Sequence, residues 1–269
     1  MSTITIEDLS IYPLKSAKAI NLEKVNVLNT GFENDRLFGI INMDNTVLTA
    51  REKPRLLHLR ISFSDSVSEI TDTDNNKCSV DLKKVASKAI QVNLFNESFK
   101  ARVIARVANE YLSNFLKEKV RLISIEPNEL RKVNEKHNGQ PDDVISLNDV
   151  APLLLVNKAS INDLNSKLEQ PISNPQFRAN IVVSTPVAYD EETWKYVKIG
   201  NCEFEVITRS ERCILFTIDP VRAHRHPKQE PLRTLAKDKR GNDTVSFGVY
   251  LVPRKLGEIS ATDTLEVIS

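Results

Sequence analysis

The chain has 269 residues, of which 41% are hydrophobic and 27% are charged, and its formal net charge is +1. This composition is typical of a globular protein with one large domain or two small ones, and a charge so close to neutral provides no general attraction to nucleic acid or anionic membranes. No apolar run approaches the roughly 18 residues that a membrane span requires, and the start of the chain lacks the pattern of a secretory signal. We therefore expect a cytoplasmic protein without a membrane span.

Alternating polar and apolar residues predict strands in the first half of the chain, at residues 4–6, 22–27 and 57–63. Between residues 106 and 119 the apolar residues instead form one stripe at helical spacing, which predicts an amphipathic helix. Strands on both sides of this helix indicate a mainly β (α+β) fold. We expect two β-rich units that join near residue 122.

The second half shows two further helices and a hairpin. Ser160 is a candidate N-cap for a helix that ends before Pro171. Gly200 and Asn201 separate two alternating runs and predict a tight hairpin, which places Cys202 on an apolar, core-facing side. A short helix is expected between Pro231 and Gly241.

Cysteine and glycine usage excludes several kinds of site. The three cysteines, Cys78, Cys202 and Cys213, form no C-x-x-C pair, so we expect neither a disulfide framework nor a four-thiolate zinc or iron–sulfur site in this chain. The seven glycines include no G-x-G arrangement, which argues against a dinucleotide or P-loop site. A phosphorylated cofactor would therefore depend on cationic side chains.

Cys213 is the most informative of the three cysteines. It follows Arg209 and Arg212 in a strand-like run, and neighbouring cations favour the thiolate, which is both a nucleophile and a soft metal ligand. The apolar residues 214–216 fit equally well with a small buried cysteine. This segment alone leaves both interpretations open.

Basic residues gather around Cys213. The stretch from residue 209 to 240 contains nine Lys or Arg residues, four acidic residues and two histidines. Such a cluster is often only a solvated face, but its position also suggests an anionic ligand or an acidic partner.

Several polar residues interrupt apolar runs, and each alone is an ordinary turn residue. Their order and spacing together with Cys213 resemble the MOSC family of molybdenum cofactor proteins, in the branch that contains the mitochondrial amidoxime reducing component and its bacterial homologues. The resemblance extends almost from end to end. The segments that carry it are residues 11–16 (IYPLKS), 35–38 (DRLF), 48–51 (LTAR), 54–56 (PRL), 160–165 (SINDLN), 177–182 (FRANIV) and 212–220 (RCILFTIDP).

The resemblance implies an N-terminal MOSC-type β-barrel domain at residues 1–122 and a MOSC β-barrel domain at residues 123–269, with pterin-bound molybdenum (the molybdenum cofactor) between them. Cys213 would be the protein ligand to the metal. Asp149 would pass protons during turnover, or would simply be a turn residue before the next strand. The residues that would hold the pterin and its phosphate are Lys15, Ser16, Arg36, Thr49, Arg51, Arg178 and Asn180.

The implied activity is a two-electron reduction of small N-hydroxylated substrates such as amidoximes and hydroxylamines. Electrons would come from an external carrier, a ferredoxin or a cytochrome b5-like protein, and its reductase, with the basic stretch 209–240 as a docking surface. Ala179, Phe216 and residues 222–226 depart from the family pattern. These departures affect the expected pocket shape, substrate preference and docking more than cofactor binding.

Two other functions remain compatible with the sequence. One is a molybdenum cofactor or sulfur carrier without reductase activity, in which Cys213 holds a persulfide. The other is a β-barrel module that binds nucleic acid. Aromatic residues make up only 6% of the chain and are not interleaved with the basic residues, as a stacking platform would require, so we expect no nucleic-acid partner.

Overall fold

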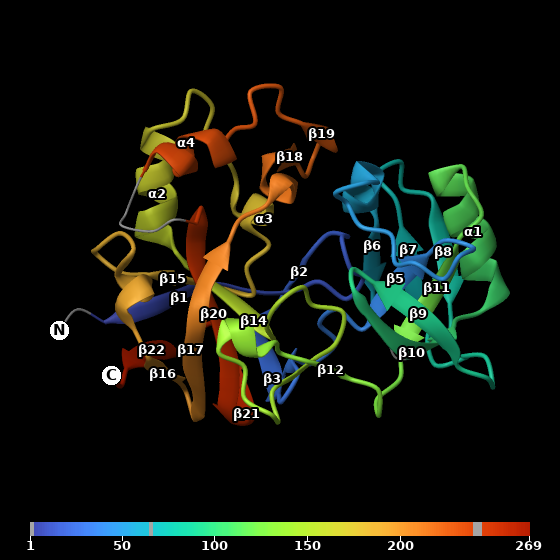
Figure 1. Cartoon of the computed structure of the whole chain (residues 1–269), viewed down its shortest axis with the longest axis horizontal. Coiled ribbons are helices and arrows are strands. Elements are labelled where there is room, and N and C mark those ends of the chain that lie inside the picture. Colours follow the sequence, from blue (N-terminus) through green and yellow to red (C-terminus); the bar gives the residue numbers. More distant parts are fainter. Residues whose placement is uncertain (1–2, 65–66, 239–243) are drawn as a thin grey trace.

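The computed structural model describes residues 3–64, 67–238 and 244–269. Within these ranges the chain is mostly β-structure, as predicted (Figure 1). The strands are β1 (Ile4–Ile11), β2 (Ile20–Asn21), β3 (Lys24–Leu28), β4 (Gly31–Phe32), β5 (Phe38–Ile41), β6 (Arg60–Ser62), β7 (Ser68–Thr71), β8 (Lys77–Val80), β9 (Ile90–Leu94), β10 (Glu97–Val103), β11 (Arg121–Ile125), β12 (Arg131–Lys132), β13 (Val144–Ile145), β14 (Leu153–Asn157), β15 (Ile181–Ser184), β16 (Tyr196–Ile199), β17 (Cys202–Glu211), β18 (Ile218–Asp219), β19 (His224–Arg225), β20 (Ser246–Lys255), β21 (Gly257–Ser260) and β22 (Thr264–Val267). The α-helices are α1 (Arg106–Leu116), α2 (Lys158–Ser166), α3 (Asn174–Phe177) and α4 (Leu232–Lys237), and the 3-10 turns are η1 (Pro54–His58), η2 (Glu135–His137), η3 (Asp190–Thr193) and η4 (Ile214–Thr217).

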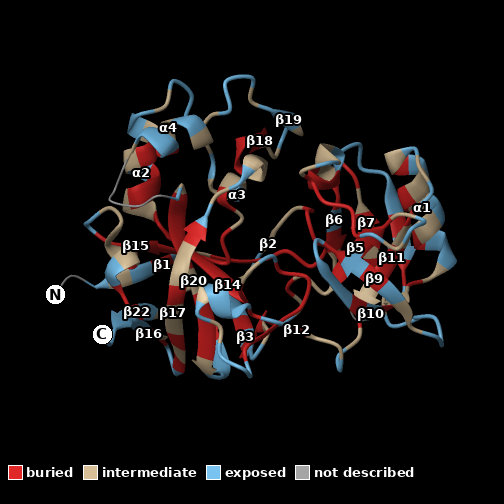
Figure 2. Ribbon diagram, viewed as in Figure 1, coloured by how far each residue is buried: buried red, intermediate tan, exposed pale blue. Residues whose placement is uncertain are grey.

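Seven strands close into a barrel. Their order is β15-β14-β20-β17-β16-β22-β1, and β1 pairs with β15 to complete the ring. Apolar side chains from these strands alternate inward and form one buried cluster, including Phe204 and Leu251. This alternation follows from the two-residue period of a strand and gives the barrel a filled core (Figure 2).

The barrel contains strands from both ends of the chain. β1 pairs with β15 and β22, and β3 pairs with both β4 and β21. In space, strands β1 to β4 therefore lie with the second half of the chain, whereas Leu14 and Ala17 between them are buried in the core of the half-barrel. The division near residue 122 stays a prediction about order along the sequence, and strands β1 and β3 pair with strands of the second half.

A second unit, called here the half-barrel, consists of the sheets β5-β11-β10-β9 and β6-β7-β8 with helix α1 packed against them. Helix α1 directs Ala108, Leu112 and Phe115 into the core, as its apolar stripe predicts. Lys117 adopts a left-handed conformation and caps the helix. The helix therefore ends before the predicted limit at residue 119.

The barrel and the half-barrel lie side by side (Figure 1). The chain leaves the barrel after β17, passes through Cys213 and η4, and enters the β18–β19 hairpin. Ile218 from this hairpin is buried in the core of the half-barrel, and the carbonyl of Val221 lies 2.9 Å from His58 Nε2 of η1. Cys213 is therefore at the point where one unit packs onto the other.

Local predictions in the second half are largely confirmed. The hairpin at Gly200 is present, with a positive φ of 55° at the glycine, and the Cys202 side chain is fully buried. Cys78 is also buried, in β8. Helix α4 begins after Pro231 and ends at Lys237, before Gly241, as predicted.

The predicted start of α2 was wrong. Asn157 caps this helix by accepting a hydrogen bond from the Ala159 amide, whereas Ser160 is buried inside it and donates to Glu191. Both residue types are good N-caps, and the buried Glu191 partner decides between them. Among the described residues, no helix is long and apolar enough to cross a membrane.

Candidate functional site

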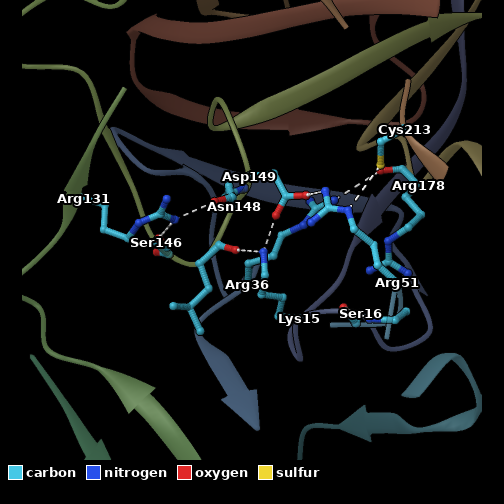
Figure 3. Close-up of polar contacts among 12 residues, drawn as sticks. Lys15, Ser16, Arg36, Arg51, Arg131, Ser146, Asn148, Asp149, Arg178 and Cys213 are labelled. Atoms are coloured by element: carbon cyan, nitrogen blue, oxygen red, sulfur yellow. Dashed lines mark hydrogen bonds and ion pairs between the residues drawn. The ribbon is translucent and has the colours of Figure 1, made fainter. Parts of the chain in front are cut away.

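A cavity of about 170 Å³ lies where the barrel meets the half-barrel. Eight of the nine predicted site residues line it and approach one another from distant parts of the chain (Figure 3). These eight residues are Lys15, Ser16, Arg36, Arg51, Asp149, Arg178, Asn180 and Cys213. Five of the seven segments quoted for the family resemblance therefore converge on one place, whereas residues 54–56 and 160–165 contribute nothing to the lining.

Thr49 is the predicted site residue that does not line the cavity. It is buried, and its carbonyl accepts hydrogen bonds from the amides of Glu52 and Lys53, at 3.1 and 2.9 Å. These bonds form the turn that carries Arg51. The structure therefore places Thr49 beneath the site.

Cys213 presents an exposed thiol at the edge of the cavity. Arg51 reaches it from the half-barrel, and its Nε donates a hydrogen bond to Cys213 Sγ at 3.3 Å. Arg209, expected beside the thiol, instead forms an ion pair with Glu192 at 3.3 Å. The thiol thus accepts its hydrogen bond from a cation that only the tertiary structure brings close. Arg212, the nearest cation in sequence, donates instead to the Phe177 carbonyl.

Asp149 links two cations. One carboxylate oxygen accepts a hydrogen bond from Lys15 and the other accepts from Arg51, the latter at 2.6 Å. Burial lowers the pKa of Lys15 to about 8, although Asp149 opposes this shift. Burial acts to raise the pKa of Asp149, but Lys15 and Arg51 together hold that pKa below its usual value. Asp149 is consequently ionised at neutral pH.

Two arginines flank the ring of Tyr12. The guanidinium carbons of Arg36 and Arg178 each lie 4.4 Å from the ring centre, a distance typical of cation–π contact. Burial lowers the pKa of Arg178 to about 10. Both arginines have positive φ angles, 50° and 56°, a conformation that is uncommon outside glycine and often marks functional sites.

Ser16 and Asn180 join the loops that line the cavity. Ser16 Oγ accepts a hydrogen bond from the Ala50 amide at 3.0 Å. Asn180 Oδ1 accepts from Arg36 at 2.9 Å, while its Nδ2 donates to the Ser10 carbonyl at 3.0 Å. Ser16 therefore helps to position the turn that carries Arg51, and Asn180 helps to position Arg36.

Sequence analysis did not assign a site role to Asn148, Arg212 or Arg131. Asn148 lines the cavity, and its buried Oδ1 has no hydrogen-bond partner in the described part of the chain. Arg212 also lines the cavity and donates to the Phe177 carbonyl at 2.8 Å. The sequence could have indicated Asn148 and Arg212, because each is adjacent to a predicted site residue, Asp149 and Cys213 respectively. Arg131 carried no signal, yet it donates to the Asn148 carbonyl at 2.6 Å and so supports the segment that bears Asp149.

The cavity lining is strongly cationic. Its five Lys and Arg side chains face two carboxylates, an excess of three positive charges. The cations are Lys15, Arg36, Arg51, Arg178 and Arg212, and the carboxylates are Asp149 and Glu211. An excess charge in a partly closed cavity favours an anionic ligand, and the exposed thiol at its edge adds a soft metal donor.

The fold and the cavity define a two-unit β-barrel protein with a cationic cavity beside a cysteine. Two family models match the chain: the MOSC N-terminal beta barrel domain at residues 3–119 and the MOSC domain at residues 142–266. The chain therefore belongs to the MOSC family, in its two-domain form.

Curated relatives agree with this assignment. The chain is 30% identical to the mitochondrial amidoxime reducing component 2 of Homo sapiens over 275 residues, which cover 96% of this chain and 82% of that protein. The same protein of Macaca fascicularis gives the same identity and coverage. The mitochondrial amidoxime-reducing component 1 of Danio rerio is 29% identical over 94% of this chain and 81% of its own length.

Proposed function

We propose that this protein binds the molybdenum cofactor in the cavity between its two units and uses it to reduce N-hydroxylated compounds. The observation that carries the proposal is the exposed Cys213 thiol at the edge of a cavity with an excess of three positive charges. The relatives named as amidoxime reducing components support the reaction class.

The residues present fit this cofactor. Cys213 offers the soft sulfur ligand that molybdenum accepts, and the arginine forks at Arg36 and Arg178 suit a phosphate group. Asn148 adds a buried acceptor, its unpartnered Oδ1 among the described residues, which suits an N–H group of a pterin. Lys15 supplies a further positive charge from the opposite side of Asp149.

When bound, the cofactor supplies a two-electron reductant that takes the oxygen atom from an N–O bond. The chain itself prepares the surroundings of that reaction. Arg51 donates a hydrogen bond to Cys213 Sγ and so fixes the position of the sulfur at the edge of the cavity. The barrel and the half-barrel enclose the site on two sides and limit access of water.

Asp149 serves in this proposal to position the Lys15 ammonium group, from which one of its carboxylate oxygens accepts a hydrogen bond. The cations Lys15 and Arg51 keep the pKa of Asp149 below its usual value, so the carboxylate is ionised at neutral pH and is a weak base. Lys15, whose pKa burial lowers to about 8, is the group that can donate a proton, and reduction of an N–OH group to N–H and water consumes protons. Lys15 is thus the proton donor of the proposal, and Asp149 orients it.

Electrons come from a separate protein, a ferredoxin or a cytochrome b5-like carrier with its reductase. Exposed basic residues occur on and around the β18–β19 hairpin and on α4, which lie at the same side of the molecule (Figure 1). The exposed residues of this basic surface are Arg222, His224, Arg225, Lys228, Arg233 and Lys237. Such a surface favours an acidic carrier, whose approach it would accelerate.

The test is metal analysis by mass spectrometry combined with pterin fluorescence, on the wild type and on Cys213→Ser, both expressed in a host that makes the cofactor. We expect near-stoichiometric molybdenum and pterin in the wild type. Cys213→Ser should keep pterin but lose reduction of amidoximes by an artificial electron donor. Cys78→Ser, which changes a buried thiol in β8, is the matched control. Folded wild type that contains neither metal nor pterin would contradict the proposal.

A further inference from the structure

Phe95 occupies the tip of the β9–β10 hairpin beside the cavity. Leu94 pairs with Glu97, so Phe95 and Asn96 form a two-residue turn. The φ angle of Phe95 is 54°, in a region that Asn, Asp or Gly usually adopts in such turns. A bulky residue there is an outlier, and strain of this kind gathers at functional sites. The sequence thus has a large aromatic residue at a position whose left-handed backbone conformation disfavours it.

The Phe95 ring lies over the cations of the site. Its centre is 4.9 Å from the guanidinium carbon of Arg51 and 5.7 Å from Lys15 Nζ. Arg51 also donates to Cys213 Sγ, so one guanidinium group separates the ring from the thiol. Phe95 nevertheless remains 52% exposed. Contact with two site cations fixes the ring, and its exposed area stays free for another partner.

The hairpin that bears Phe95 is held on both sides. Asn93 exchanges backbone hydrogen bonds of 2.8 Å with Asn45 and Val47, in the segment that leads to Arg51. On the other strand, Glu97 accepts a hydrogen bond from Arg131 at 2.7 Å. Arg131 in turn donates to the carbonyl of Asn148, next to Asp149. The ring is therefore tied to both segments that build the site.

We propose that Phe95 is a substrate-positioning residue whose ring stacks against the aromatic substituent of an N-hydroxylated substrate at the cavity mouth. This inference rests on the proposed reductase function and names the substrate class that the site prefers. Offset stacking of two rings strengthens binding beyond simple burial. An aliphatic substrate lacks that contact, so the site selects aromatic over aliphatic amidoximes.

The test compares Phe95→Ala with the wild type on an aromatic and an aliphatic amidoxime of similar size. We expect KM for the aromatic amidoxime to rise about 3- to 10-fold with kcat nearly unchanged, the pattern of lost ground-state binding. The aliphatic substrate should change less than about 2-fold. Phe95→Trp, which keeps an aromatic ring at this position, should show the wild-type preference for the aromatic amidoxime. Phe63→Ala, which removes another exposed phenylalanine of the half-barrel, is the control and should match the wild type.

A second readout separates this inference from the proposed function. Calorimetric titration of both amidoximes without an electron donor measures binding in the absence of turnover. We expect Phe95→Ala to lose affinity only for the aromatic compound. Equal losses for both compounds, or a fall in kcat for both, would show that Phe95 acts only by orienting Arg51 and would overturn the inference. If the wild type reduces neither compound, the reductase proposal fails, while the titrations still decide the role of Phe95.

Discussion

Arg51 Nε donates a hydrogen bond to Cys213 Sγ at 3.3 Å, although 162 positions separate the two residues in the chain. The arginine belongs to the half-barrel, and the cysteine lies two residues beyond the end of the barrel strand β17. The same guanidinium group donates to Asp149 at 2.6 Å. A single side chain thus connects the thiol, the carboxylate and the two structural units.

Arg51→Lys keeps the positive charge but removes the fork that contacts two partners at once. We expect kcat/KM for amidoxime reduction to fall about 10-fold or more, because a hydrogen bond to a charged group contributes about 1.5–3 kcal/mol. Steady-state kinetics and molybdenum content measure the effect. Arg106→Lys, in an exposed pair with Glu110 on α1, is the control. Unchanged kinetics in Arg51→Lys would show that the contact with Cys213 does not matter for turnover.

Asp149→Asn leaves the buried Lys15 ammonium group without a counter-charge. Loss of one partner of a buried pair costs about 3–5 kcal/mol, and the partial exposure of Asp149 reduces this to about 2 kcal/mol of unfolding free energy at pH 7. The pKa of Asp149 is lower in the folded state, so its contribution is present above the unfolded pKa and disappears as pH falls below about 4. Urea unfolding at several pH values measures both effects. If the free energy of unfolding falls equally with decreasing pH in the wild type and in Asp149→Asn, the Lys15–Asp149 pair does not contribute. Glu110→Gln, which changes an exposed carboxylate on α1, is the control.

Lys15 should make anion binding depend on pH. Burial lowers its pKa to about 8, so the ammonium charge that attracts an anion is lost as pH rises through that value. We expect the affinity of the cofactor-free protein for pyrophosphate, measured by calorimetry, to decrease between pH 7 and 9. Lys15→Met should bind weakly at pH 7 and show a smaller decrease. Lys77→Met, an exposed lysine on β8, should behave as wild type, and a pH profile shared by all three proteins would exclude Lys15 as the cause.

Arg222 and Lys228 test the basic surface without touching the cavity lining. Their side chains are highly exposed, at 79% and 66%. We expect the double change to Glu to raise KM for an acidic protein carrier several-fold at low salt, with a smaller effect at high salt. Turnover with a small artificial donor should stay at the wild-type rate. If the double variant and the wild type turn over at equal rates with the protein carrier, the carrier docks on another surface.

Local patterns were sufficient to predict the mainly β fold, the Gly200 hairpin and the buried position of Cys202. These features depend on residues close in sequence, where periodicity and turn chemistry decide the structure. The start of α2 was misplaced because Asn157 and Ser160 are both capable N-caps. The choice depends on the Ser160 contact with Glu191, which is distant in sequence and has no local signal.

The site was predicted through its motif segments and not through its contacts. Order and spacing led to Lys15, Arg51, Asp149 and Cys213, all of which line the cavity. Which cation meets the thiol was not predictable, since Arg209 is near in sequence and Arg51 is near in space. Phe95 was also missed, because a phenylalanine in a two-residue turn contradicts the local preferences from which turns are predicted.

The position of β1 in the barrel has a consequence for how the chain folds during synthesis. Ile4 pairs with Leu265, and Thr5 pairs with Ser184, so β1 is synthesised long before the strands with which it pairs. Closing so long a loop is entropically costly and slow. The half-barrel, whose strands pair within residues 38–125, has its partners much sooner. We expect nascent chains to contain a folded half-barrel beside an open barrel. The unpaired strand edges of the open barrel need protection from aggregation until β22 has been synthesised.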